Sequence, residues 1–221
     1  SVIGVAGFNT IGVTSRTGGE NKPSRDFAPI NTSALVRGAY TFRRLEIGLL
    51  GGKVGPSFLG GFSLQGEAGS LGIRAEGHQK SNQLTKQNSF AIAGGLDYRF
   101  TPKFITQVEQ YYNGAGLKSA SELSDQENGF TTPTLQLGRT YTALTGIYDI
   151  TGVLNMKALL LVNDGDQSML ANFYLTYSVA ANANLVAAYM MPRGKTPLEA
   201  VPQTEYGLYP AVFSVQTAVY F

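Results

Sequence analysis

The feature that most constrains this sequence is a repeated segment of roughly ten residues in which apolar and polar side chains alternate. Phe90, Ile92 and Leu96 share one parity, while Asp97 and Arg99 share the other. Alternation with period two indicates a β-strand with two different faces, and this length matches a transmembrane strand. The segments lie at residues 2–14, 33–42, 45–54, 57–69, 71–80, 89–100, 103–113, 139–150, 153–163, 168–178, 184–192 and 210–221.

The connections between these segments are long and short in a regular order. Every even-numbered connection is tight, at residues 43–44, 69–70, 101–102, 151–152 and 179–183. The longest connections, at 15–32, 114–138 and 193–209, are all odd-numbered. Outer-membrane barrels have short periplasmic turns and longer outer loops. The sequence therefore predicts an all-β chain forming one domain over 1–221, a transmembrane antiparallel up-and-down β-barrel of twelve strands. Both termini are expected to be periplasmic and the long loops extracellular.

Composition narrows the function classes. Charged residues make up 14% of the chain, against roughly 25% in an ordinary soluble domain. The absence of Cys excludes a disulfide framework, a thiolate metal site and a Cys nucleophile. A net charge of +2 is too small to argue for nucleic acid as a partner. We expect no cofactor and no metal. Because an alternating segment follows Ser1 directly, no signal peptide is visible, and we interpret the chain as mature or trimmed.

One stretch offers a helical alternative. Residues 167–192 contain no charged residue and are long enough to span a bilayer as a helix. Polar residues such as Asn172, Asn182 and Asn184 interrupt the stretch. Unpaired polar groups are costly in lipid, so two strands are favoured over a helix.

Strand parity assigns the charged side chains to the interior of the barrel. Phe62, Ile73, Leu96, Phe173 and Phe213 are expected to point outward, because charge on a lipid-facing wall costs ~2–4 kcal/mol at mid-depth. The acids and bases of the interior are in balance, and they cluster on the neighbouring strands 57–69 to 103–113. The predicted inward set is Arg37, Glu46, Glu67, Arg74, Glu76, His78, Lys80, Asp97, Arg99, Glu109 and Lys157.

Two interpretations of this charge network stay open. Pairs such as Glu67 with Arg74, or Asp97 with Glu76 and Arg99 nearby, would cross-link the wall and partly plug the lumen. Alternatively, the charges form a constriction that selects solutes. The first interpretation is favoured over the second.

Aromatic residues gather at the ends of the segments, for example Tyr98 with Phe100 and Tyr111 with Tyr112. Tyr prefers a membrane–water interface, because its body is apolar and its tip is polar. Their placement beside the short turns indicates aromatic girdles, although Tyr and Phe also favour strands in general.

Enzymatic chemistry is not expected. His78 is the sole histidine, and parity places it inside, away from lipid substrates. No G-x-S-x-G elbow is present. The run 163–166, Asn-Asp-Gly-Asp, lacks the spaced ligands of a calcium loop and is interpreted as a hairpin turn. The acidic segment 121–128 is interpreted as a solvated loop tip.

The last strand carries a resemblance to a known family. The chain ends Val-Tyr-Phe221, and counting back in twos from Phe221 gives Val219, Thr217, Val215 and Phe213. This resembles the assembly signal of bacterial outer-membrane barrels, here formed by Phe213, Val215, Val219, Tyr220 and Phe221. The resemblance implies insertion by the barrel-assembly machinery and outer-membrane lipid as surroundings.

Other segments look like a group of poorly characterised bacterial outer-membrane proteins. The segments are 45–52, 71–77, 95–100, 110–114 and 175–178. This resemblance implies a fold and an outer-membrane location, but no activity.

Two functions follow from the sequence. The first is a narrow passive or substrate-specific channel, because twelve strands leave an interior between those of filled eight-stranded and open sixteen-stranded barrels. The alternative is a structural or accessory barrel that scaffolds or anchors a larger membrane protein complex, with another membrane protein as its partner.

Overall fold

The structure is a computed structural model that describes residues 2–8, 32–118, 122, 136–198 and 202–220. The predicted strand portion 9–14, the loop tip 123–128 and the terminal Phe221 lie outside the described residues. Residues 2–8 are described by their backbone alone.

The described chain is built from β-strands and one short 3-10 helix. The elements are β1 (Val2–Phe8), β2 (Thr32–Phe42), β3 (Leu45–Val54), β4 (Ser57–Ala68), β5 (Leu71–Asn82), β6 (Asn88–Thr101), β7 (Phe104–Asn113), β8 (Thr140–Asp149), β9 (Leu154–Asn163), β10 (Met169–Ala180), β11 (Ala183–Arg193), η2 (Tyr206–Leu208) and β12 (Val212–Val219). Among the described residues, no helix is long and apolar enough to cross a membrane.

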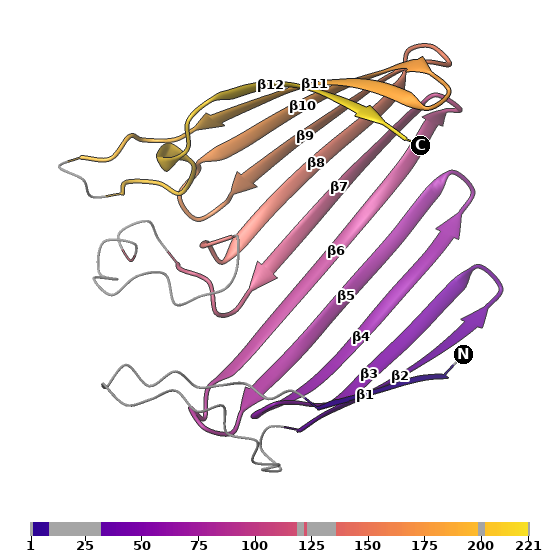
Figure 1. The fold of residues 1–221 in the computed structure, drawn as a ribbon. Helices are drawn as coiled ribbons and strands as arrows, with labels where there is room; N and C mark the ends of the chain where they lie inside the picture. Colours follow the sequence, from indigo (N-terminus) through magenta and orange to yellow (C-terminus); the bar gives the residue numbers. More distant parts are fainter. Residues whose placement is uncertain (1, 9–31, 119–121, 123–135, 199–201, 221) are drawn as a thin grey trace.

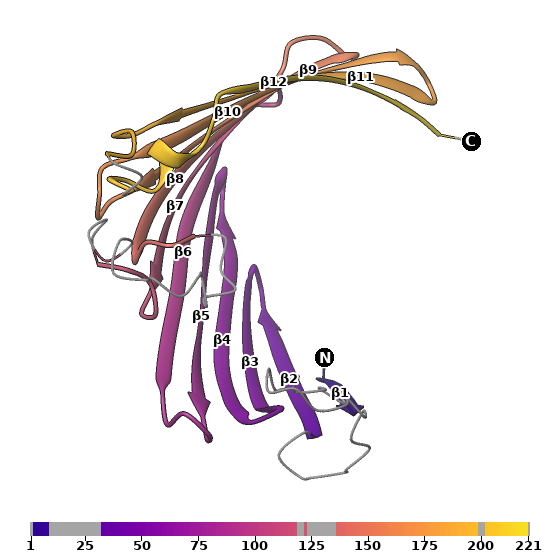
Figure 2. The same cartoon turned by 60° about the vertical axis from the view of Figure 1, so that its left-hand side comes forward.

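The strands form one antiparallel up-and-down sheet whose order follows the chain from β1 to β12 (Figure 1). Each strand pairs with the next, for example Gln65 with Arg74 and Arg74 with Gly95. The register shifts beside the β6–β7 and β10–β11 turns. Figure 2 shows that the sheet is strongly curved. The sheet is open in this structure, and β1 and β12 form its two edges.

The predicted strand bounds agree closely with the structure. From β2 to β12, each strand begins and ends within two residues of the predicted position. The apolar stretch 167–192 forms β10 and most of β11, so the strand interpretation is confirmed and the helical one is wrong. The pairing of Phe173 with Tyr189 runs through the middle of this hairpin.

The β2–β3, β4–β5, β6–β7, β8–β9 and β10–β11 turns lie at one end of the sheet, and the β3–β4, β5–β6 and β9–β10 connections lie at the other (Figure 1). The β2–β3 turn places Arg43 at a φ of 56°, and the β4–β5 turn places Gly69 at a φ of 65°. Gly accepts this left-handed conformation without strain. In Figure 1, β1 begins and β12 ends on the side of the short turns.

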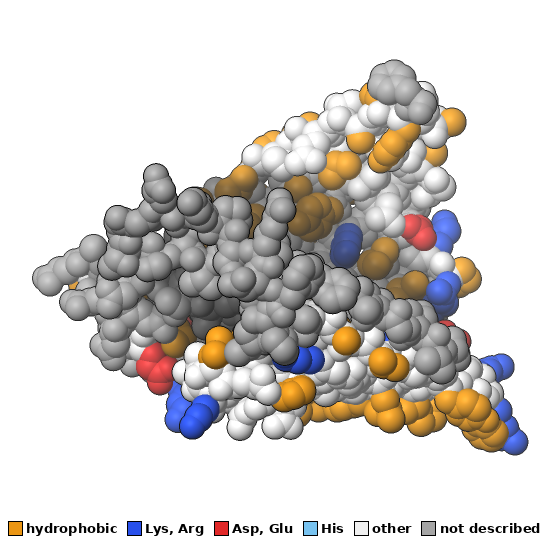
Figure 3. Space-filling model, turned by 60° about the horizontal axis from the view of Figure 1, so that its bottom comes forward, with side chains coloured by type: hydrophobic (Ala, Val, Ile, Leu, Met, Phe, Trp, Pro, Cys, Tyr) orange, Lys and Arg blue, Asp and Glu red, His pale blue; other side chains and the backbone are white. Residues whose placement is uncertain are grey.

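The sheet has almost no conventional core. The buried apolar residues of the described chain are Ala91, Tyr141, Ala171 and Tyr206. Large apolar side chains are instead exposed along the strands, for example Leu49 at 66% and Phe213 at 69%. Most of them share one parity, whereas most charged side chains have the other. Figure 3 shows acidic and basic side chains inside the hollow, and hydrophobic side chains along the outer surface of one wall.

Aromatic rings join neighbouring strands on the apolar face, beside the short turns. Tyr98 contacts Phe100, Phe100 stacks on Phe104, and Phe104 meets Tyr148, with ring centroids 4.8, 5.4 and 6.0 Å apart. At the β2–β3 turn, the Arg43 guanidinium lies 5.3 Å from the centre of the Phe42 ring. These contacts match the placement expected of an aromatic girdle.

Candidate functional site

The candidate site is the charged face of β2 to β7, where the strand register aligns polar side chains in rows. One row contains Glu46, Gln65, Arg74, Gly95 and Glu109. The next row toward the long loops contains Gly48, Ser63, Glu76, Ala93 and Tyr111. We call this charged surface the lumen face. The small residues of both rows leave room for the long side chains beside them.

Arg37 and Glu46 form an ion pair between β2 and β3. The Nη2 of Arg37 donates a hydrogen bond to Oε1 of Glu46 at 3.2 Å. The two residues do not face each other in the register, since Arg37 pairs with Leu50. The arginine side chain bridges this offset by lying across Gly48, where a Cβ would stand 3.1 Å from its Nη2.

Arg74 and Glu109 form the second ion pair, and it skips a strand. Arg74 lies on β5 and Glu109 on β7, and both pair with Gly95 of β6. The Nε of Arg74 lies 3.8 Å from Oε2 of Glu109. The same Oε2 accepts a hydrogen bond of 3.3 Å from the Gln107 side chain. The structure thus pairs Arg74 with Glu109 rather than with Glu67, because Gly95 leaves the path to β7 open.

The other charged residues of the predicted network form no ion pair in the described part of the chain. Asp97 lies on β6 with its carboxylate directly over Gly72. Lys157 stands on β9, opposite Ile147 of β8 and Tyr174 of β10, away from β4 to β7. The remaining members, placed on β4, β5 and β6, are Glu67, Glu76, His78, Lys80 and Arg99.

Two cavities of about 390 Å³ each adjoin one another on the lumen face. We call the one nearer the short turns the turn-side cavity; Glu46, Gln65, Arg74 and Glu109 line it. Leu50, Leu59, Gly61, His78 and Tyr111 line the other, the loop-side cavity.

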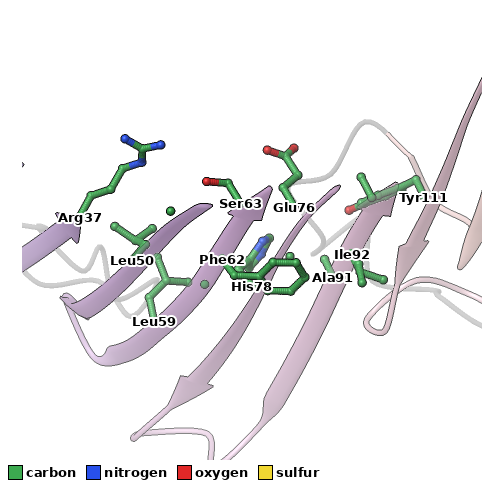
Figure 4. A pocket seen from close by; sticks show the side chains of 14 residues that line it. Arg37, Leu50, Leu59, Phe62, Ser63, Glu76, His78, Ala91, Ile92 and Tyr111 are labelled. Atoms are coloured by element: carbon green, nitrogen blue, oxygen red, sulfur yellow. The ribbon is translucent and has the colours of Figure 1, made fainter. Parts of the chain in front are cut away.

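Arg37, Ser63, Glu76 and Ala93 line both cavities. In Figure 4, Arg37, Ser63 and Glu76 rise from the same side of the sheet, with Ser63 between the other two. The lumen face therefore forms one continuous depression across β2 to β7, mainly polar toward the short turns and mainly apolar toward the long loops.

A buried cluster that the sequence did not predict fixes the β11–β12 connection to the same face. Glu205 is fully buried. Its carboxylate accepts hydrogen bonds from the Tyr141 hydroxyl at 2.5 Å, the Asn163 amide at 2.7 Å and the Leu137 backbone N–H at 3.1 Å. Tyr141 shares a row with Tyr111, whose ring centroid is 6.4 Å away. The segment before β12 therefore folds over the loop end of the lumen face.

The β9–β10 turn completes this cluster. Asp166 accepts a hydrogen bond of 2.6 Å from the backbone N–H of Glu205. Its other oxygen accepts hydrogen bonds from the backbone and hydroxyl of Ser168, at 2.8 and 2.6 Å. The run 163–166 is thus a hairpin turn, as predicted. Through Asp166 it also holds the β11–β12 connection in place. Burial, reinforced by the Glu205 carboxylate, raises the pKa of Tyr206 in this loop.

Among the described residues, no group of three His, Cys, Asp or Glu side chains is placed to hold a metal ion. The predicted assembly signal has three residues on one face of β12, where Phe213, Val215 and Val219 pair with Tyr189, Ala187 and Ala183 of β11. Tyr220 is exposed just beyond the strand.

Comparisons with known proteins give the class of fold. No protein-family model matches the sequence, and no curated protein is detectably similar to it. Among solved structures, one from work on the asymmetric conductivity of engineered proteins is similar with a TM-score of 0.56 and 12% identity, over 86% of this chain and 55% of that one. A mutant of the Rhodopseudomonas blastica porin is similar with a TM-score of 0.52 and 11% identity, over 72% of this chain and 50% of that one.

A third structure, the outer membrane channel DcaP of Acinetobacter baumannii, has a TM-score of 0.49 and 12% identity, over 73% of this chain and 56% of that one. The chain spans about half the length of the first two structures. The protein therefore has the antiparallel up-and-down fold found in porins.

Proposed function

We propose that this protein forms a narrow passive or substrate-specific channel in a bacterial outer membrane. The observation that carries the proposal is the separation of side chains between the two faces of the sheet. One face exposes large apolar residues from β2 to β12. The other holds the ion pairs Arg37–Glu46 and Arg74–Glu109. Extended apolar patches on a protein surface mark contact with another apolar phase, and for a curved sheet with a polar hollow that phase is lipid.

Closure of the sheet is part of this proposal. An open edge in the hydrocarbon region would leave backbone N–H and C=O groups without partners, each at a cost of several kcal/mol. We therefore propose that β1 pairs with β12 in the membrane to give a barrel of twelve strands. The short turns and both termini are then periplasmic, and the long connections are extracellular, as in other barrels of this kind.

The geometry of the charged residues favours a wet passage over a dry plug. The side chains of Arg74 and Glu109 are 43% and 35% exposed, and those of Arg37 and Glu46 are 40% and 44% exposed. The two cavities lie between and beside these pairs. The name of the Rhodopseudomonas blastica structure, a porin, is consistent with this function. The structural neighbours give no support to an accessory barrel.

The test is ion conductance of the purified protein in a planar lipid bilayer. We expect discrete steps of small conductance from folded protein. Folding is checked independently by the shift in gel migration on heating. A protein heated to unfolding before reconstitution serves as the control. Folded protein that inserts and gives no steps would contradict the channel.

A further inference from the structure

We propose that the lumen face holds a binding site for a small organic cation, a protonated amine attached to an apolar or aromatic body, with Glu76 as its anionic partner. The inference rests on the proposed function, because it names the class of solute that such a channel would take. Two observations support it: the balance of charged side chains that line the two adjoining cavities, and the apolar side chains that line the loop-side cavity.

The charge balance of the cavities leaves one carboxylate in surplus. Arg37 is paired with Glu46, and Arg74 is paired with Glu109. Glu76 lines both cavities and forms no ion pair or hydrogen bond within the described part of the chain. It is exposed on the same side of the sheet as Arg37 and Ser63 (Figure 4), and it stands on β5 two residues after Arg74. An unpaired carboxylate beside neutralised ion pairs attracts a cation and repels an anion.

The walls favour an organic cation over a bare ion. The side chains of Leu50 and Leu59 line the loop-side cavity, together with the Tyr111 ring. Small residues, Gly61 and Ala91 among them, keep its floor open. A small ligand site is typically apolar, with a few polar groups that fix orientation. An aromatic face also attracts a cation. The loop-side cavity can thus hold the apolar body of the ligand. Glu76, which lines both cavities, can pair with the ammonium group where the cavities adjoin.

Basic residues near the cavities do not cancel this preference. Lys80 lies on the same face of β5, two rows farther toward the loops, and does not line either cavity. His78 lines the loop-side cavity and lies one row farther toward the loops than Glu76. The arginines present donors to the turn-side cavity, but each already contacts a carboxylate.

The experiment is calorimetric titration of the folded protein in non-ionic detergent with 2-phenylethylammonium as the probe, at neutral pH. We expect saturable binding by the unaltered protein. Glu76→Gln should weaken it at least tenfold, and Glu76→Asp, which keeps the charge, should retain it. Glu67→Gln is the matched control, because Glu67 lies on the same face of the sheet as Glu76. Glu67 also forms no ion pair in the described chain, and it lines neither cavity. It should leave binding unchanged.

Two further probes separate charge from hydrophobicity. Uncharged 2-phenylethanol and anionic phenylacetate should show no saturable binding. Equal binding of phenylacetate, or undiminished binding by a folded Glu76→Gln variant, would overturn the site. So would a complete lack of amine binding by the unaltered protein.

Conductance distinguishes failure of this inference from failure of the channel. In a bilayer, the amine should reduce the current through the unaltered protein and through Glu67→Gln, but not through Glu76→Gln. Glu76-dependent binding in a protein that never conducts would contradict the proposed channel but support the binding site. A protein that conducts but binds no amine would contradict the binding site but support the channel.

Discussion

Arg74 reaches across Gly95 to Glu109, so that one ion pair links β5 to β7 without involving a side chain of β6. A Cβ at Gly95 would lie 3.3 Å from Nε of Arg74. The glycine therefore sets which acid the arginine meets. The pair remains open to water, since its side chains are 43% and 35% exposed.

We predict that Arg74→Ala changes selectivity and leaves stability almost unchanged. Ion pairs in contact with water contribute about 0–1 kcal/mol, because water screens the charge that is left behind. Removing a cation from the lumen face should shift the reversal potential in a salt gradient toward cation selectivity. Reversal potential and urea unfolding of the folded protein measure the two effects.

Glu109→Gln is the matched variant, because it removes the opposite charge from the same pair. It should shift selectivity toward anions, again with little effect on unfolding. A loss of about 3–5 kcal/mol in either variant would indicate a dry, buried pair, and would support the plugged lumen instead.

The second prediction concerns the fully buried Glu205. Glu205→Ala removes the acceptor for the Tyr141 hydroxyl and the Asn163 amide, which are themselves buried. Each buried donor left unsatisfied costs about 1–3 kcal/mol. We expect faster amide hydrogen exchange over residues 202–207 and a lower free energy of unfolding. Exchange in β3 and β4 should stay as it is.

Glu122→Gln provides the control for this variant. Glu122 also accepts a backbone hydrogen bond, from Lys118 at 3.0 Å, but at an exposed position. Its loss should change stability by well under about 1 kcal/mol. Equal effects of the two substitutions would show that burial of Glu205 does not hold the β11–β12 connection.

The third prediction is a loss of stability at high pH through Tyr206. Burial of Tyr206, with Glu205 nearby, raises the pKa of its hydroxyl above the usual value of 10.0. The unfolded chain ionises near that value, while the folded chain still holds the proton. The contribution to stability is therefore complete below about pH 10 and declines as the pH rises from there toward the folded pKa.

Unfolding in urea between about pH 9 and about pH 11.5 measures this decline. Tyr206→Phe should be less sensitive to pH over that range than the unaltered protein. Tyr209→Phe, at a position that is 43% exposed, should retain the full decline. Identical pH profiles for the unaltered protein and Tyr206→Phe would contradict the prediction.

The strands could be predicted from sequence because their signals are local. Alternation of side chains and tight turns such as 43–44 and 69–70 are visible within a dozen residues. The pairing of Arg74 was not predictable in this way, because it depends on the register of three strands and on Gly95 lying between the partners. Glu205 was missed because it lies in an irregular connection and meets Tyr141 and Asn163 far away in sequence. The inward parity of Tyr141 and Asn163 at neighbouring strand ends was the available signal for a polar contact there.

The last prediction tests which face of the sheet meets lipid. Phe173 and Asn172 are adjacent on β10 and have opposite parity. Phe173 is 45% exposed and pairs with Ala158 and Tyr189 on the apolar face. Phe173→Arg places a charge in the lipid at a cost of about 2–4 kcal/mol near mid-depth. Asn172→Arg places the same charge on the opposite face of β10, toward the hollow of the sheet, where water is available to it.

We therefore expect Phe173→Arg to reduce the free energy of unfolding in lipid vesicles by about that amount. Asn172→Arg should change this free energy by much less. The measurement is reversible urea titration in vesicles, followed by tyrosine fluorescence and gel migration. Because a shift of one residue exchanges the two faces of a strand, the opposite ranking would mean that the charged face meets lipid. The proposed channel and the Glu76 site would then both be lost, since each requires the charges of β2 to β7 to surround the hollow of the sheet.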